Sequence, residues 1–161
     1  MLDLIKLTGA RQTRDGLALR VNVVARVYDA VGRLLKEERM HNLIPTVGLE
    51  HVAALLEDAT AVTEMGYGGV GTGTTPAAAG DTALETPLGS RVALTSRVRS
   101  GAQTTYTFSV TGLTGAVTET IIANDPSAGD ILARVVHGAF NLTPSVTLTY
   151  DWTVTVADDG V

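Results

Sequence analysis

Residues 66–71, with the sequence Gly-Tyr-Gly-Gly-Val-Gly, fit the G-x-G-x-x-G pattern that can hold the phosphates of a dinucleotide. In that chemistry the last glycine opens a helix, and the free backbone amides of its first turn bind the pyrophosphate. Here the chain continues as Thr-Gly-Thr-Thr up to Pro76, so no helix can start properly at this point. No Walker-type Gly-Lys-Ser/Thr sequence occurs in the chain. We therefore expect no nucleotide cofactor.

Acid, base and metal-binding residues are likewise scattered along the chain. The three histidines, His41, His51 and His137, show no metal-ligand spacing, and there is no cysteine to complete a site. No Gly-x-Ser-x-Gly sequence places a serine nucleophile. The paired carboxylates at 37–38 and 158–159 are chain neighbours, and neighbours in a strand point to opposite faces. We predict no catalytic residue, no metal site and no cofactor, with a structural or surface role for each histidine.

Composition narrows the classes of partner. The net charge of −5 and the pI of about 5.1 weigh against binding to nucleic acid or to an anionic membrane. No run is long and apolar enough to cross a membrane, and the first residues lack the apolar core of a signal peptide. Without cysteine, no disulfide framework can form. We expect a protein that has no nucleic-acid or membrane partner and is made and assembled in the cytoplasm of the producing cell.

The elements that position these residues are mostly strands. Apolar and polar residues alternate in several segments, which is typical of half-buried strands. The alternation predicts strands at 17–28, 65–70, 91–99, 105–111, 117–123, 131–140 and 146–156. A charged edge strand is predicted within 33–44, because charge on an edge strand discourages aggregation. Phe108 and Trp152 lie on apolar faces, so we expect them in the core.

One short helix is predicted, from Thr46 to about Asp58. Thr46 can cap its first turn, and one apolar stripe would face the sheet. This stripe consists of Leu49, Val52, Ala53 and Leu56. The predicted fold is mainly β, an antiparallel β-sandwich or barrel-like domain with one short α-helix. The domain would span 17–161, and residues 1–16 would form either an N-terminal arm that docks on a neighbouring subunit or an edge strand and loop.

The order of several short motifs resembles that of small virion proteins of tailed bacteriophages. The central phrase is Val-Gly-Thr-Gly-Thr-Thr-Pro at 70–76, followed by Gly-Asp-Thr-Ala-Leu at 80–84. An Asn-Leu-Ile segment at 42–44 leads into the short helix before it. The phrase is followed, in order, by an Arg-led strand from Arg91, Gly-Ala-Val-Thr-Glu at 115–119, Ile-Leu-Ala-Arg at 131–134 and a Thr-rich strand at 147–155. The resemblance therefore covers residues 42–156.

Proteins of this kind are head-, tail- or fibre-associated structural components. The resemblance implies a non-enzymatic virion protein, and the compact β-rich chain without a repetitive shaft favours a capsid decoration protein. Such a protein would lie on the capsid surface, bind the major capsid protein from outside, associate with itself as a homotrimer and stabilise the shell. The alternatives are a tail, fibre or baseplate component, a carbohydrate-binding β-sandwich module, which would need exposed aromatic residues, and an enzyme.

Five residues are the candidate contacts of such a protein. Leu2, Leu4 and Ile5 lie in the candidate arm, and Tyr67 and Val70 lie in the Gly-rich segment. Apolar residues flanked by flexible polar ones are suited to ordering on a partner. We therefore expect the arm or the Gly-rich loop to clamp adjacent capsid subunits against the internal pressure of packaged DNA.

Overall fold

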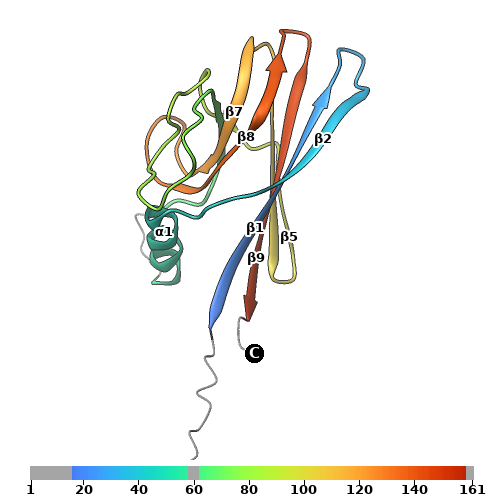
Figure 1. The fold of residues 1–161 in the computed structure, drawn as a ribbon. Helices are drawn as coiled ribbons and strands as arrows, with labels where there is room; N and C mark the ends of the chain where they lie inside the picture. Colours follow the sequence, from blue (N-terminus) through green and yellow to red (C-terminus); the bar gives the residue numbers. More distant parts are fainter. Residues whose placement is uncertain (1–15, 58–61, 159–161) are drawn as a thin grey trace, which may run out of the picture.

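The computed structural model describes residues 16–57 and 62–158, which form two antiparallel sheets and one helix (Figure 1). The five-stranded sheet has the order β2 (Leu34–His41), β1 (Leu17–Tyr28), β9 (Thr147–Asp158), β6 (Gln103–Val110) and β5 (Ser96–Ser100). The four-stranded sheet has the order β4 (Val92–Ala93), β3 (Tyr67–Gly71), β7 (Gly115–Ala123) and β8 (Ile131–Leu142). The helix α1 (Thr46–Leu56) lies beside β8.

The core lies between the inner faces of the two sheets, and the alternation of the long strands determines which residues enter it. In β1 the buried residues are every second one from Val21 to Val27, and in β9 every second one from Leu148 to Val154. Phe108 and Trp152 are fully buried, as expected. The ring of Phe108 stacks on that of Tyr150 with centroids 5.3 Å apart. The prediction of a mainly β, sandwich-like fold with one short helix is confirmed.

The single strand predicted at 91–99 is wrong, because this segment crosses from one sheet to the other. Its first part is β4, which pairs with β3, and its second part is β5, which pairs with β6. The change occurs within one residue: the Leu94 amide donates to the Gly66 carbonyl at 2.9 Å, and the Thr95 amide donates to the Thr107 carbonyl at 2.8 Å. The whole of β5 is exposed.

The buried face of α1 also differs from the predicted stripe. Its buried residues are Gly48 and His51, whereas Leu49 and Leu56 are exposed. A side chain at position 48 would collide with the backbone carbonyl of Leu132, so the absence of one lets the helix approach β8. A hydrophobic pattern cannot detect a contact made through a glycine and a histidine.

The start of α1 differs from the prediction too. Thr46 is the first helical residue, the N-cap is Pro45, and no side chain caps the helix. The Thr46 amide instead donates to the Ala79 carbonyl at 2.9 Å. The amides of Gly48 and Leu49, which the Thr46 hydroxyl was expected to cap, donate to the Pro45 carbonyl at 3.0 and 3.2 Å. The charged edge strand, in contrast, is confirmed, because β2 lies at the edge of its sheet.

Candidate functional site

A buried carboxylate, that of Glu119 on β7, lies at the centre of the loop that follows β3. Its side chain is fully buried. It accepts hydrogen bonds from the backbone amides of Gly73, Glu85 and Thr86 at 3.0, 3.0 and 2.8 Å. Arg134 on β8 donates its Nε–H to the same carboxylate at 2.9 Å. Glu119 is therefore compensated both by a cation and by three amides that no strand satisfies.

The guanidinium of Arg134 joins the same loop to the sheet. Its Nη1 donates to the Asp81 carboxylate at 2.8 Å, and its Nη2 donates to the Thr75 carbonyl at 3.2 Å. The Glu85 carboxylate lies 3.5 Å from Nη2. Arg134, Glu119, Asp81 and Glu85 are called the ion cluster below.

Hydrogen bonds shift the pKa values of Arg134, Asp81 and Glu85 toward their charged forms. Burial lowers the pKa of Arg134, but hydrogen bonds to Asp81 and Glu119 outweigh this effect and raise it overall. For Asp81, burial favours a higher pKa, and hydrogen bonds from the Ala78 amide and Arg134 lower it overall. The pKa of Glu85 is lowered chiefly by its hydrogen bonds from the hydroxyl and amide of Thr75. The arrangement is thus a set of mutually compensated charges that fixes a loop.

The ion cluster explains the glycines of the phrase at 70–76. A Cβ added to Gly73 would lie 2.6 Å from a Glu119 carboxylate oxygen, and one added to Gly71 would also collide with this carboxylate. The threonine of the 115–119 motif takes part as well, because the Thr118 hydroxyl donates to the Gly73 carbonyl at 2.8 Å. The motifs at 70–76, 80–84, 115–119 and 131–134 therefore meet in one place.

The sequence reasoning missed Glu119 and Arg134. Each is a charged residue within an apolar strand, as in Ile-Leu-Ala-Arg-Val-Val at 131–136. A charge at such a position must be paired if the strand is buried on both faces. That pattern could have identified both residues, although not their partners.

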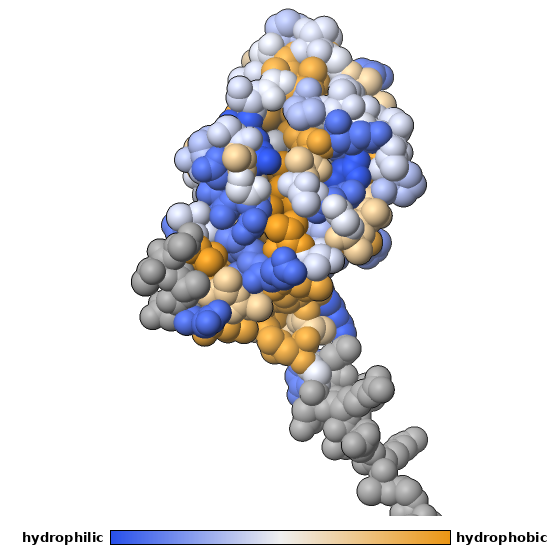
Figure 2. Space-filling model, turned by 90° about the vertical axis from the view of Figure 1, so that its left-hand side faces the viewer, coloured by the Kyte–Doolittle hydropathy of each residue, from blue (hydrophilic) through white to orange (hydrophobic). Residues whose placement is uncertain are grey.

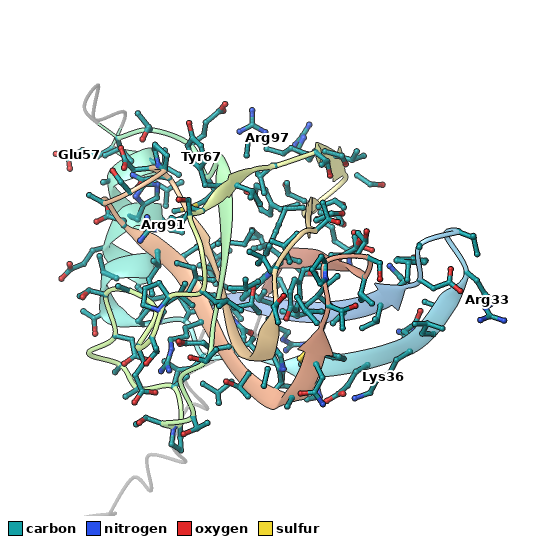
Figure 3. The ribbon with its side chains drawn as sticks, turned by 90° about the horizontal axis from the view of Figure 1, so that it is seen from above. Arg33, Lys36, Glu57, Tyr67, Arg91 and Arg97 are labelled. Carbon is teal, nitrogen blue, oxygen red and sulfur yellow. The ribbon has the colours of Figure 1, made fainter. Side chains whose placement is uncertain are left out.

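The predicted contact residues fall into three groups. Leu2, Leu4 and Ile5 lie outside the described residues. Val70 is only 2% exposed and packs in the core, so its prediction as a surface contact is wrong. It lies in β3, which matches the strand predicted at 65–70. Tyr67, at the start of β3, is partly exposed. Seen from above, Tyr67 lies on the same side as Arg91 and Arg97, away from Arg33 and Lys36 (Figure 3).

An exposed apolar surface lies where β1 begins and β9 ends. In both strands the row of core-facing residues continues beyond the buried core. Leu17 and Val156 are exposed, at 71% and 40%, and Leu19, opposite Val156 in the register, is partly buried. Further along both strands the second sheet covers this row of side chains, but at this end the row is exposed or only partly buried.

Helix α1 adds to the same surface. A hollow lined by residues 19–22, 41–44 and Leu49 separates the start of β1 from α1. On α1 itself Leu49, Leu55 and Leu56 are exposed. Figure 2 shows apolar residues gathered at this end of the molecule, over α1 and the start of β1. This surface, formed by Leu17, Leu19, Val156, Leu49 and the hollow, is called the α1 end below.

Two of the histidines lie inside the fold. His51 is buried, with its Nδ1 2.9 Å from an Asp130 carboxylate oxygen, and it fastens α1 to the loop before β8. His137 donates from Nδ1 to the Gly138 carbonyl at 2.7 Å, and its Nε2 lies 2.9 Å from the Tyr150 hydroxyl. Because a carbonyl can only accept, the proton is on Nδ1, and Nε2 accepts from Tyr150. Burial lowers the pKa of His137 and favours this neutral form.

Other kinds of site were sought among the described residues. Within 16–57 and 62–158, no three His, Asp or Glu side chains are grouped so that they could hold a metal ion. No helix within the same ranges is long and apolar enough to cross a membrane. Comparison with known proteins gives no match to a family model, to a curated protein or to a solved structure.

Proposed function

We propose that this chain is a non-enzymatic structural protein of a tailed-phage virion, which binds the outside of the capsid and stabilises it. The observation that carries the proposal is the meeting of the phage-like motifs in the ion cluster. Glu119 and Arg134 come from two of these motifs, and Gly73 and Asp81 come from two more. These motifs lie on or beside the neighbouring strands β3, β7 and β8, and one set of contacts would explain why they occur together.

The α1 end gives this function a surface. An exposed apolar surface at the end of a rigid sheet pair is suited to protein association. Several copies docked on a symmetric shell would add weak single contacts into firm attachment. Bound across the joints between shell subunits, the rigid β domain would oppose the pressure of packaged DNA.

The alternatives differ in what they require of the surface. A tail, fibre or baseplate component could use the same apolar end. A carbohydrate-binding module would need exposed aromatic rings, and Phe108, Phe140 and Trp152 are all buried. The first alternative differs from shell decoration in copy number, which can be measured.

The test is the amount of this protein in purified particles of the phage that encodes it, by gel densitometry against the major shell protein. A ratio near parity is expected for a protein that covers the shell. A trace ratio would overturn shell decoration and place the protein in the tail or baseplate. Complete absence from the particles would overturn the virion role altogether.

A further inference from the structure

We propose that a hollow on the outer face of the four-stranded sheet, with Arg91 in its lining, binds one carboxylate group that carries a short apolar stem. The hollow lies between the chain that leads into β4 and the turn that joins β7 to β8. It shares no lining residue with the hollow at the α1 end. This inference goes beyond the proposed function, and its test needs no capsid.

The first observation is the place of the Arg91 side chain on the sheet. A Cβ added to Gly68 would collide with the core residue Phe108, so the next residue, Gly69, faces away from the core. On that outer face, a Cβ added to Gly69 would lie 3.3 Å from Cγ of Arg91 and 3.2 Å from the side chain of Leu84. The glycine therefore leaves room for both side chains to lie close against β3.

The second observation is the way in which the guanidinium of Arg91 is held. Its Nη1 donates to the Asp125 carbonyl at 2.9 Å and also to the Ala128 carbonyl, both in the turn between β7 and β8. Two acceptors on one nitrogen fix the orientation of the group. Within residues 16–57 and 62–158, Nε and Nη2 have no hydrogen-bond acceptor. These two donors lie side by side in a guanidinium, at the spacing of the two oxygens of a carboxylate.

The third observation is the charge of Arg91. Four other arginines form ion pairs with carboxylates, namely Arg26, Arg33, Arg97 and Arg134. In the part of the chain that the structure describes, Arg91 contacts no carboxylate. Burial lowers its pKa, and the charge of Asp125 offsets part of this effect. The Asp125 carboxylate itself accepts from the amides of Ser127 and Ala128, at 2.9 and 2.8 Å. A partly buried cation of this kind is stabilised by an anion that reaches it.

The size and lining of the hollow favour a particular kind of anion. Its volume is about 250 Å³, which suits one side chain or a short acid more than a larger ligand. Of the described residues that line it, Arg91 alone is charged, and Leu84, Pro87 and Pro126 offer apolar contact to a stem. A phosphate group carries up to two negative charges, which one cation would leave partly uncompensated. A carboxylate, from an acidic side chain of a protein or from a free short-chain acid, fits both features.

Two-dimensional NMR of the whole chain tests the site directly. The probe is N-acetyl-glutamic acid α-amide, added at constant ionic strength, and its neutral counterpart N-acetyl-glutamine α-amide is the matched control. We expect the amide resonances of Gly69, Ser90 and Ser127 to shift saturably with the acid and not with the control. Equal shifts with the two compounds, or no shift with the acid, would overturn the proposal.

Butyrate, titrated in the same way, distinguishes the two sources of the carboxylate. Tighter binding of the glutamic acid probe than of butyrate would identify a protein side chain as the source, and the reverse order would identify a free acid. Either result requires that the shifts occur around the hollow. Shifts that occur only elsewhere on the domain would contradict the proposal.

Substitutions of arginine separate this site from a general effect of charge. Arg91→Met should weaken binding of the acidic probe at least about tenfold, because it removes a charged hydrogen-bond donor. Arg91→Lys keeps the charge without the paired donors and should bind several-fold more weakly than the wild type. Arg99→Met removes the same charge from the exposed strand β5 and should leave the affinity unchanged. If Arg91→Met binds as tightly as Arg99→Met, the proposal is wrong.

A last pair of variants leaves the hydrogen bonds of Arg91 to the turn in place. Ser90 is exposed and lines the same hollow. Ser90→Glu adds a carboxylate there, which would either occupy Arg91 or repel the probe, so binding should be lost. Ser90→Gln adds a side chain of the same size without charge and should still bind. Unchanged binding in Ser90→Glu would mean that the probe binds outside the hollow, and would overturn the proposal.

Discussion

The ion cluster and the α1 end of this domain differ in the kind of side chain that they bury or expose. In the ion cluster, the charged side chains of Glu119 and Arg134 are buried, and each has its partners within the chain. At the α1 end, apolar side chains that would normally be buried are exposed. A polar group that is already satisfied has little left to offer a partner, whereas an exposed apolar surface gains free energy when a partner covers it.

The contrast shows why the most recognisable part of the sequence differs from the surface proposed to bind. The Gly-Thr-Gly-Thr-Thr phrase is constrained because Glu119 occupies the space beside its glycines. A buried charge cluster adds little net stability over well-packed apolar residues, but it becomes costly once one member is removed. The proposed binding surface, made of leucines and a valine, needs no such signature.

The largest effect is expected from breaking the ion cluster. Arg134→Met leaves the buried Glu119 carboxylate without its cation, which should lower the free energy of unfolding by about 3–5 kcal/mol. Denaturation in urea measures the loss. Arg33→Met removes an arginine from an exposed ion pair with Asp29 and should cost less than about 1 kcal/mol. Equal losses for the two variants would mean that the ion cluster does not hold the loop.

A smaller effect is expected from crowding the same carboxylate. Gly73→Ala places a methyl group against Glu119, and the shift needed to relieve the clash should cost about 1–3 kcal/mol. Gly80→Ala is the matched control, because nothing lies within 4 Å of a Cβ at that position, and it should change stability by less than about 0.5 kcal/mol. A Gly73→Ala variant as stable as Gly80→Ala would contradict the close packing of this loop.

Stability should also depend on pH through His137. Because burial lowers its pKa in the folded state, the unfolded chain takes up a proton first as the pH falls. The free energy of unfolding should therefore decline below about pH 6.5, the usual value for histidine, until the folded-state pKa is reached. Urea titrations between pH 8 and 5 should show this slope in the wild type and a reduced slope in His137→Gln. Identical slopes would exclude His137 as the cause.

A separate decline at lower pH belongs to the ion cluster. The lowered pKa of Asp81 contributes stability that is present above about pH 4 and is lost as the pH falls through the folded-state value. Asp81→Asn should remove part of this decline and leave the His137 slope unchanged. A change in the His137 slope instead would show that the two groups are coupled.

The smallest effect on stability is expected at the α1 end. Leu17→Ala changes an exposed residue of the core-facing row of β1 and should alter the free energy of unfolding by less than about 0.5 kcal/mol. Leu148→Ala makes the same change at a fully buried position of β9 and should cost about 2–5 kcal/mol. If Leu17→Ala were as damaging as Leu148→Ala, the surface would be part of the core and not a free binding face.

Sequence patterns predicted the parts of this fold that depend on local alternation. The long strands β1 and β9, the charged edge β2 and the buried Phe108 and Trp152 all follow from a period of two. The face of α1 could not be predicted in this way, because its buried residues are Gly48 and His51. Sequence patterns cannot predict the crossing between the two sheets at Leu94 either, because apolar residues alternate on both sides of it.

Local sequence patterns could not predict the ion cluster, for a different reason. Its members come from positions 81, 85, 119 and 134, and only the strand order brings them together. The same holds for the α1 end, which exists because two strands extend past the sheet that covers them. Among the residues named in advance as contacts, Val70 failed because an apolar residue in a Gly-rich stretch can be a buried strand residue.

The most direct test of the proposed function is co-sedimentation of the purified protein with empty shells of the proposed phage. The full chain should bind saturably, at a ratio fixed by the symmetry of the shell. A variant that lacks residues 1–8 should fail to sediment while keeping its urea midpoint, because the deletion leaves the described domain intact. If the full chain does not sediment with the shells, the decoration function is contradicted. If the shortened chain binds as well as the full one, the arm has no part in it.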